Sequence, residues 1–288
     1  MFASPLPDSV LPFHAIAITG ASSGLGAALA LRAAGPGRTL FLAGRNDERL
    51  EKIAEQARSA GAQAHAQRVD VTDGQALKTW ITACEAQAPL DLVIANAGIS
   101  GGTGGAGDAQ SNQTPALPDT EATRPQNPPE PPEQIAKILA VNLHGAIDTV
   151  LAALPAMQTR GRGQIGVVAS LAGYRGWAGA PAYCGSKAGI QVWAEGMRGA
   201  LRPSGVGLSV INPGFVRTPM TDANGFSMPF MVEPERAAEI ILRGLARNRG
   251  RISFPWQMAW IAGLTRLLPQ SLIDRIQDRL PRKGQAQE

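Results

Sequence analysis

Cysteine and histidine are scarce in this chain of 288 residues. Its two cysteines, Cys84 and Cys184, form no CxxC pair, which argues against a disulfide scaffold and is typical of a reducing compartment. The three histidines lie far apart in the sequence, so we expect no metal site. A chain of this length buries most of the surface that its unfolded form exposes, so it needs neither a disulfide nor a metal to fold.

Long apolar runs and clustered charges are also missing. No apolar run reaches membrane-spanning length, and residues 1–15 lack the basic segment and apolar core of a secretory signal. The net charge of +4 and the pI near 9.4 arise from dispersed lysines and arginines. Such a surface attracts an anionic cofactor but lacks the basic, aromatic-containing block that is typical of nucleic-acid binding. We therefore expect a cytoplasmic protein that does not bind nucleic acid.

Apolar runs of strand length alternate along the chain with longer segments of helical periodicity. Strands are expected at residues 14–19, 38–43, 64–69, 90–95, 164–169, 207–211 and 251–254. Helices are expected at residues 25–34, 48–60, 75–86, 133–157, 181–201 and 233–247. This alternation predicts a doubly wound α/β domain with a parallel sheet. We assign residues 1–255 to this domain and residues 256–288 to a C-terminal helical extension, interrupted at Pro269.

One stretch breaks the alternation. Residues 100–132 are rich in glycine and proline and contain almost no large apolar side chain. Such a stretch cannot bury enough surface to offset the entropy lost on ordering. We therefore interpret it as a mobile insertion in the domain.

A glycine-rich turn stands at the first strand-to-helix junction. Residues 19–26 read TGASSGLG, which is the spacing TGxxxGxG rather than the GxGxxG of other dinucleotide folds. Glycines there let the backbone approach a pyrophosphate, and the N–H groups at the helix start face its charge. A merely structural turn is the alternative. Asn96, after the fourth expected strand, can tie strand ends through its side chain, and Asp70-Val71 can hold an adenine ring; ordinary loops are the alternative at both places.

A second group of polar residues follows the fifth expected strand. Ser170 ends that strand, and Tyr183 and Lys187 lie four residues apart, on one face of an expected helix. The pKa of a free phenol is about 10, so it exchanges protons poorly at neutral pH. A nearby ammonium, helped by the positive nicotinamide of an oxidised cofactor, favours the phenolate and lowers that pKa. We therefore expect Tyr183 and Lys187 to share one cleft.

Taken together, these motifs resemble the short-chain dehydrogenase/reductase family. TGASSGLG, Asn96-Ala97-Gly98, Asn142, Ser170, the Tyr183/Lys187 pair and Pro213-Gly214 occur in the order and approximate spacing of that family, over roughly residues 13–254. Two departures are the long stretch between Gly98 and Asn142, which leaves the cleft entrance undefined, and the motif Ala95-Asn96-Ala97-Gly98, where the family often has a second Asn.

The resemblance implies a role for each catalytic candidate. Tyr183 would be the general acid in reduction and the general base in oxidation, and Lys187 would hold the nicotinamide ribose and lower the pKa of Tyr183. Ser170 would hydrogen-bond the substrate oxygen, and Asn142 would hold a water that links Lys187 to solvent. Pro213-Gly214 and Thr218 would border the nicotinamide.

The end of the second expected strand indicates which cofactor is bound. NAD enzymes usually carry an acid there, whereas this chain has Gly44 followed by Arg45, which can pair with a 2′-phosphate. NADP(H) is therefore favoured, with NAD(H) and a solvated Arg45 as the alternative. The expected cofactor contacts are Thr19, Gly20, Ser22, Ser23, Gly24, Leu25, Gly26, Arg45, Asp70, Val71, Asn96, Ala97, Gly98, Tyr183, Lys187, Pro213, Gly214, Val216 and Thr218.

The sequence leaves the substrate and the partners open. The loop after Pro213 is apolar, which favours a hydrophobic carbonyl or alcohol substrate, acyl or lipid-like. The amphipathic tail 257–280 either packs on its own domain or a neighbouring subunit, or forms a lid or a membrane-surface helix. We expect an oxidoreductase that forms a homo-oligomer. The rival hypotheses are a dinucleotide-binding protein without turnover and a peripheral membrane protein.

The insertion generates a direct prediction. Deleting most of residues 100–132 should leave the melting temperature nearly unchanged, because a mobile segment contributes little to the core. Thermal unfolding of the deletion variant and the full chain would measure this. A collapse in stability would contradict the interpretation, whereas a change in substrate affinity alone would place the segment at the cleft entrance.

Overall fold

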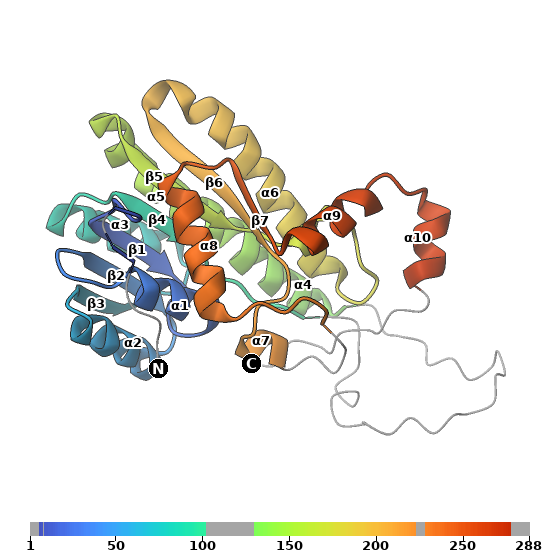
Figure 1. The fold of residues 1–288 in the computed structure, drawn as a ribbon, viewed down its shortest axis with the longest axis horizontal. Helices are drawn as coiled ribbons and strands as arrows, with labels where there is room; N and C mark the ends of the chain where they lie inside the picture. Colours follow the sequence, from blue (N-terminus) through green and yellow to red (C-terminus); the bar gives the residue numbers. More distant parts are fainter. Residues whose placement is uncertain (1–5, 8, 102–129, 223–227, 278–288) are drawn as a thin grey trace.

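The computed structural model describes residues 6–7, 9–101, 130–222 and 228–277 (Figure 1). One parallel sheet runs through this part of the chain, in the order β3-β2-β1-β4-β5-β6-β7. Its strands are β1 Ala15–Thr19, β2 Thr39–Gly44, β3 Gln63–Arg68, β4 Leu92–Ala95, β5 Gly163–Val168, β6 Val206–Pro213 and β7 Arg251–Phe254. The predicted doubly wound α/β fold is confirmed.

Helices cover both faces of the sheet. On one face lie α1 Gly24–Ala33, α2 Asp47–Ser59 and α8 Pro234–Ala246; on the other lie α3 Gly74–Gln87, α5 Gly145–Arg160 and α6 Pro181–Leu201. Successive side chains of a strand point to opposite faces, so Ile16 and Ile18 enter the first core and Ala15 and Ala17 the second. The sheet is therefore packed between two buried apolar layers, one on each face.

The predicted helix 133–157 is instead a rod of three elements. α4 Pro132–Leu139 continues through a π-helical turn, Ala140–His144, into α5. A π-turn inside an α-helix is rare and often marks a functional site. The rod is long and apolar enough to cross a membrane by length and composition alone, but half of its most apolar window is buried. It packs on β4, β5, α3 and α6, as a core helix does.

The C-terminal bound of the predicted insertion, residue 132, lies too far along the chain. Residues 102–129 lie outside the described part of the chain. Glu130, which lies inside the predicted insertion, is buried in the domain, and α4 begins at Pro132. Composition alone misplaced this end, because a run of prolines can start a helix as well as prevent one.

The described part of the C-terminal extension, residues 256–277, contains the helices α9 Trp256–Thr265 and α10 Gln270–Gln277, which are separated near Pro269 as predicted. α9 packs on the 3₁₀ turn Leu171–Tyr174 and on β7, beyond which both helices lie (Figure 1). Its outward face is apolar and exposed. The side chains on that face and its continuation are Trp256, Trp260, Ile261, Leu264 and Leu267.

Candidate functional site

A cleft of about 390 Å³ opens at the carboxyl ends of the strands. It lies where the strand order reverses, between β1 and β4, which is the usual ligand crevice of an open α/β sheet. The predicted site residues that line it are Gly20, Ser22, Ser23, Gly24, Leu25, Gly26, Arg45, Asp70, Val71, Asn96, Ala97, Gly98, Ser170, Tyr183, Lys187, Pro213, Gly214, Val216 and Thr218. Thr19 and Asn142 are fully buried and support this lining from behind.

The glycine-rich turn leaves the start of α1 open to a ligand. Gly20 and Gly24 adopt φ values of +67° and +53°, which residues other than glycine rarely adopt. A Cβ on Gly26 would collide with the carbonyl oxygen of Gly20. Ser23 at the N-cap makes no side-chain cap, and the first turn of α1 contains no acid. The positive end of this helix therefore faces the cleft without a charge partner of its own, as an anion site requires.

Asn96 ties the ends of β1 and β4 together. Its side-chain nitrogen donates to the carbonyl oxygens of Thr19 and Gly20 at 2.9 and 3.2 Å. The Thr19 hydroxyl in turn accepts the backbone N–H groups of Asn96 and Ala97 at 3.1 and 3.2 Å. The tie expected for Asn96 is therefore present, and it fixes the glycine-rich turn against the loop after β4.

Two arginines stand at the β2 end of the cleft. Arg45 follows Gly44, where a Cβ would lie 3.2 Å from the Ser22 side chain, so an acidic side chain there would crowd the turn. Arg49, in the first turn of α2, also lines the cleft and was missed from the sequence. The sequence signal that could have indicated Arg49 is its position four residues after Arg45, at the start of the helix that follows β2.

Asp70 is held ionised opposite Arg45. Burial raises its pKa, but hydrogen bonds from Thr72 and the positive charges of Arg45 and Arg68 outweigh it, so the pKa lies below its usual value. The carboxylate accepts the N–H and hydroxyl of Thr72 at 3.0 and 2.8 Å. Asp70 therefore offers a fixed acceptor at the cleft rim.

Tyr183 and Ser170 meet at the opposite end of the cleft. Burial raises the pKa of the Tyr183 phenol, and a hydrogen bond with the Ser170 side chain acts in the opposite direction. In the ligand-free chain the pKa of Tyr183 is therefore raised rather than lowered, although Lys187 lies nearby. In the free protein Tyr183 is a neutral phenol, the form that donates a proton.

Lys187 lies one turn after Tyr183 on α6. Its Nζ donates to the carbonyl oxygen of Val168 at 2.8 Å and lies 5.9 Å from the centre of the Tyr183 ring. Burial lowers the pKa of the Lys187 ammonium to about 8. A Cβ on Gly98 would lie 3.4 Å from this Nζ, so the absence of a side chain there keeps the approach to the ammonium open.

Asn142 joins three elements around the cleft. Its amide accepts the N–H of Ile99 at 2.8 Å and donates to the Ile99 carbonyl at 2.9 Å and to the Ser186 hydroxyl at 3.1 Å. Ser186 donates to the carbonyl oxygen of Tyr183 at 2.7 Å. Both amide N–H groups are therefore used by the protein, and one lone pair of Oδ1 is left for the water that the family resemblance implies.

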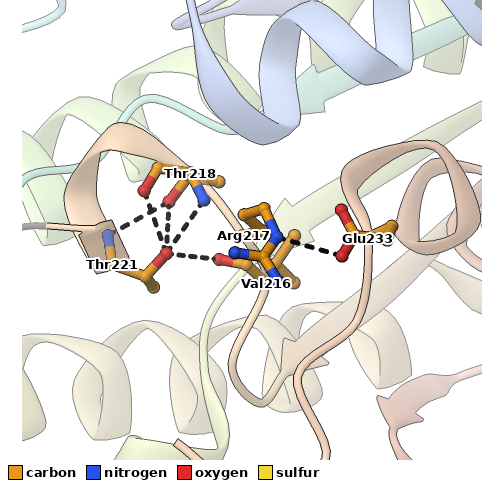
Figure 2. A network of polar contacts seen from close by, with 5 residues as sticks. All are labelled: Val216, Arg217, Thr218, Thr221 and Glu233. Atoms are coloured by element: carbon orange, nitrogen blue, oxygen red, sulfur yellow. Dashed lines mark hydrogen bonds and ion pairs between the residues drawn. The ribbon is translucent and has the colours of Figure 1, made fainter. Parts of the chain in front are cut away.

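Figure 2 shows polar contacts of the loop after β6, whose residues Val216, Thr218 and Thr221 line the cleft. Thr221 Oγ1 accepts the N–H of Thr218 at 2.8 Å and bonds the carbonyl oxygen of Val216, also at 2.8 Å. Arg217 pairs with Glu233 at 3.0 Å. A Cβ on Gly24 would lie only 3.2 Å from the Thr218 methyl group. The loop therefore packs closely against the glycine-rich turn.

Within the described ranges, no group of three His, Cys, Asp or Glu side chains is placed to hold a metal ion. The phenol, ammonium and hydroxyl of Tyr183, Lys187 and Ser170 instead supply a proton donor, a cation and a hydrogen-bond donor at one end of the cleft. Arg45, Arg49 and the start of α1 make the other end positive. This arrangement can bind an elongated anionic ligand and transfer a proton beside it.

Comparison with known proteins gives a consistent result. The sequence profile of the short-chain dehydrogenases matches residues 14–226. An uncharacterized oxidoreductase of Myxococcus xanthus is 39% identical over 94% of this chain and 98% of its own. The ketoacyl reductase HetN of Nostoc sp. is 31% identical over 80% and 74%. A short-chain dehydrogenase from Sphingobium yanoikuyae, solved in complex with NADPH, superimposes with a TM-score of 0.70 at 25% identity, over 93% and 98% of the two chains.

The ionisation of Tyr183 can be measured directly, because the chain has only two tyrosines. The tyrosinate absorbance of the protein minus that of Tyr183→Phe isolates this phenol. We expect it to ionise above the value of about 10 for free tyrosine. Ser170→Ala should raise the pKa further, because a hydrogen bond that favours the phenolate is lost. Ionisation below the free value in the ligand-free protein would contradict the role assigned to burial.

Proposed function

The chain belongs to the short-chain dehydrogenase family of oxidoreductases, and from this premise we propose that it reduces a hydrophobic carbonyl compound with NADPH, using Tyr183 as the proton donor. The observation that carries the proposal is one cleft with Tyr183, Ser170 and Lys187 at one end and the glycine-rich turn with Arg45 at the other. A dinucleotide is long enough to span both ends.

The residues of the cleft fit NADP(H). The open start of α1 suits the pyrophosphate, and Arg45, assisted by Arg49, suits a 2′-phosphate that an acid at Gly44 would repel. Asp70 is an acceptor for the adenine amine. Lys187, approachable past Gly98, would donate to the nicotinamide ribose hydroxyls. When bound, the reduced nicotinamide supplies the hydride.

The protein's own groups would handle the proton. Tyr183 is kept neutral by burial, so its hydroxyl can donate to the substrate oxygen as negative charge develops there. Ser170, beside that hydroxyl, would hold the same oxygen. Lys187, with its pKa near 8, is charged at neutral pH and stabilises the phenolate that donation leaves. A water on the free lone pair of Asn142 Oδ1 would return the proton through Lys187.

A ketoacyl-type carbonyl is the substrate class that we favour. The similarity to the ketoacyl reductase HetN supports it. Part of the loop expected to be apolar, including Phe226, lies outside the described residues, but Phe230 within it is half exposed and Met220 lines the cleft. The rival of a dinucleotide-binding protein without turnover gives no reason for a buried, desolvated Lys187 beside Tyr183.

Arg45→Ala tests the cofactor. It should weaken NADPH binding about ten- to a hundred-fold and leave NADH binding nearly unchanged, because only a charge-assisted bond to the 2′-phosphate is lost. Fluorescence titration of both cofactors measures this. Lys52→Ala, which removes an exposed positive charge from α2 outside the cleft, is the control. Equal losses for both cofactors in Arg45→Ala would refute the assignment.

Tyr183→Phe and Lys187→Met test the mechanism. Tyr183→Phe removes only the hydroxyl, so NADPH binding should persist while carbonyl reduction falls at least about a hundred-fold. Lys187→Met should weaken NADPH binding and also move the pH dependence of turnover upward, because the phenolate loses its cation. Ser170→Ala should lower turnover with little change in NADPH affinity.

The measurements are NADPH titration and pH–rate profiles on a panel of ketoacyl and aromatic carbonyl compounds, followed by NADPH absorbance. Substantial reduction by Tyr183→Phe of a substrate that the wild type uses would remove the mechanism. Tight NADPH binding with no turnover of any carbonyl would favour the rival.

A further inference from the structure

Glu130 is a buried carboxylate outside the cleft, and it has no role in the mechanism proposed above. It precedes α4, and its residue is only 6% exposed. Its Oε2 accepts the backbone N–H of Ala182 at 2.7 Å, across 52 residues of sequence. Its Oε1 is buried and has no hydrogen-bond partner in the described part of the chain. Burying a carboxylate that is only half satisfied is costly, so its position calls for a compensating interaction.

That interaction is with the start of α6. This helix of 21 residues begins with Ala180 at the N-cap, which provides no side-chain cap, and Pro181, which has no N–H. Its first turn contains no acid. The Glu130 carboxylate therefore supplies from outside the cap and the negative charge that the helix start lacks.

The capped N–H belongs to the residue directly before Tyr183. The same turn is held further along by Asn142 through Ser186, which bonds the Tyr183 carbonyl. α4 and the π-turn pack against α6. Glu130, just before the rod 132–160, and Asn142, within it, thus hold the start of α6 at two points, one on each side of Tyr183 in the sequence.

We propose that Glu130 is a positioning residue, whose carboxylate caps α6 from outside the helix and fixes the turn that aims the Tyr183 phenol at Ser170 and the substrate. The proposal rests on the carbonyl reduction proposed above. A displacement of a reacting group by about 1 Å can cost a hundred-fold in rate, so the position of this turn matters for turnover.

The test compares Glu130→Ala, Glu130→Gln and a control, Glu85→Gln. Glu85 also accepts a backbone N–H, from Leu90 at 3.0 Å, and pairs with Arg160, but lies before β4 at the opposite edge of the sheet. With a carbonyl that the wild type reduces, kcat of Glu130→Ala should fall about tenfold or more, while its NADPH dissociation constant stays within about twofold. Glu130→Gln keeps an acceptor for Ala182 and should recover most of kcat.

Two readouts need no substrate. Amide hydrogen exchange of residues 175–190 should rise in Glu130→Ala and much less in Glu130→Gln. The pKa of Tyr183, measured by tyrosinate absorbance, should be higher in Glu130→Ala than in Glu130→Gln, because both variants lose the charge but only the first releases the turn and its contact with Ser170. Glu85→Gln should change neither.

Three results would overturn the proposal. One is wild-type kcat in Glu130→Ala. Another is a fall of kcat in Glu130→Ala that is accompanied by comparable losses of NADPH affinity and melting temperature, which would make Glu130 merely structural. The third is equal exchange and equal Tyr183 pKa in the alanine and glutamine variants. If the wild type reduces no carbonyl, the proposed function fails by itself, and the exchange and pKa comparison still decides the role of Glu130.

Discussion

The side-chain amide of Asn96 spans the point at which the strand order reverses, and the geometry of the cleft depends on it. The chain leaves β1 and β4 toward opposite faces of the sheet, so a crevice must open between their ends. Asn96 closes the base of that crevice by bonding Thr19 and Gly20. The backbones approach so closely that a Cβ on Gly20 would lie 2.7 Å from Ala97. These contacts fix the distance between the glycine-rich turn and the loop after β4, past which a ligand would approach Lys187.

Helix starts show a second constraint. α2 and α3 are capped by their own sequence, since Asn46 accepts the N–H of Arg49 at 2.8 Å and Asp73 that of Ala76 at 2.9 Å. α1 and α6, which border the cleft, have no such side-chain cap. At α1 the uncapped start faces the cleft, where an anion would complete it. At α6 a carboxylate from a distant segment fills the place. We propose that the start of α1 serves binding and that the start of α6 serves support.

Most of the fold could be predicted because its signals are local. Buried parallel strands such as Leu92–Ala95 are continuous apolar runs, and α6 follows from its periodicity after Pro181. The contacts that cross the sequence could not be predicted. No local pattern indicates that Glu130, within a proline-rich stretch, bonds Ala182, or that Asn142 lies in a π-turn and bonds Ile99. These depend on how the rod 132–160 packs on α6, which only tertiary structure defines.

The chemistry of Tyr183 shows the same limit in energetic terms. Spacing places Tyr183 and Lys187 on one helix face, and Coulomb attraction alone would then lower the pKa of the phenol. Packing adds desolvation, which acts against both charged forms: it raises the pKa of Tyr183 and lowers that of Lys187 to about 8. The free protein therefore keeps a neutral phenol beside a weakened cation. In the mechanism that we propose, the neutral phenol donates the proton, and positive charge or hydrogen bonding from a bound ligand would favour the phenolate that donation leaves. Burial of Tyr183 and Lys187, which opposes the Coulomb attraction between their charged forms, is the part of this balance that spacing in the sequence does not contain.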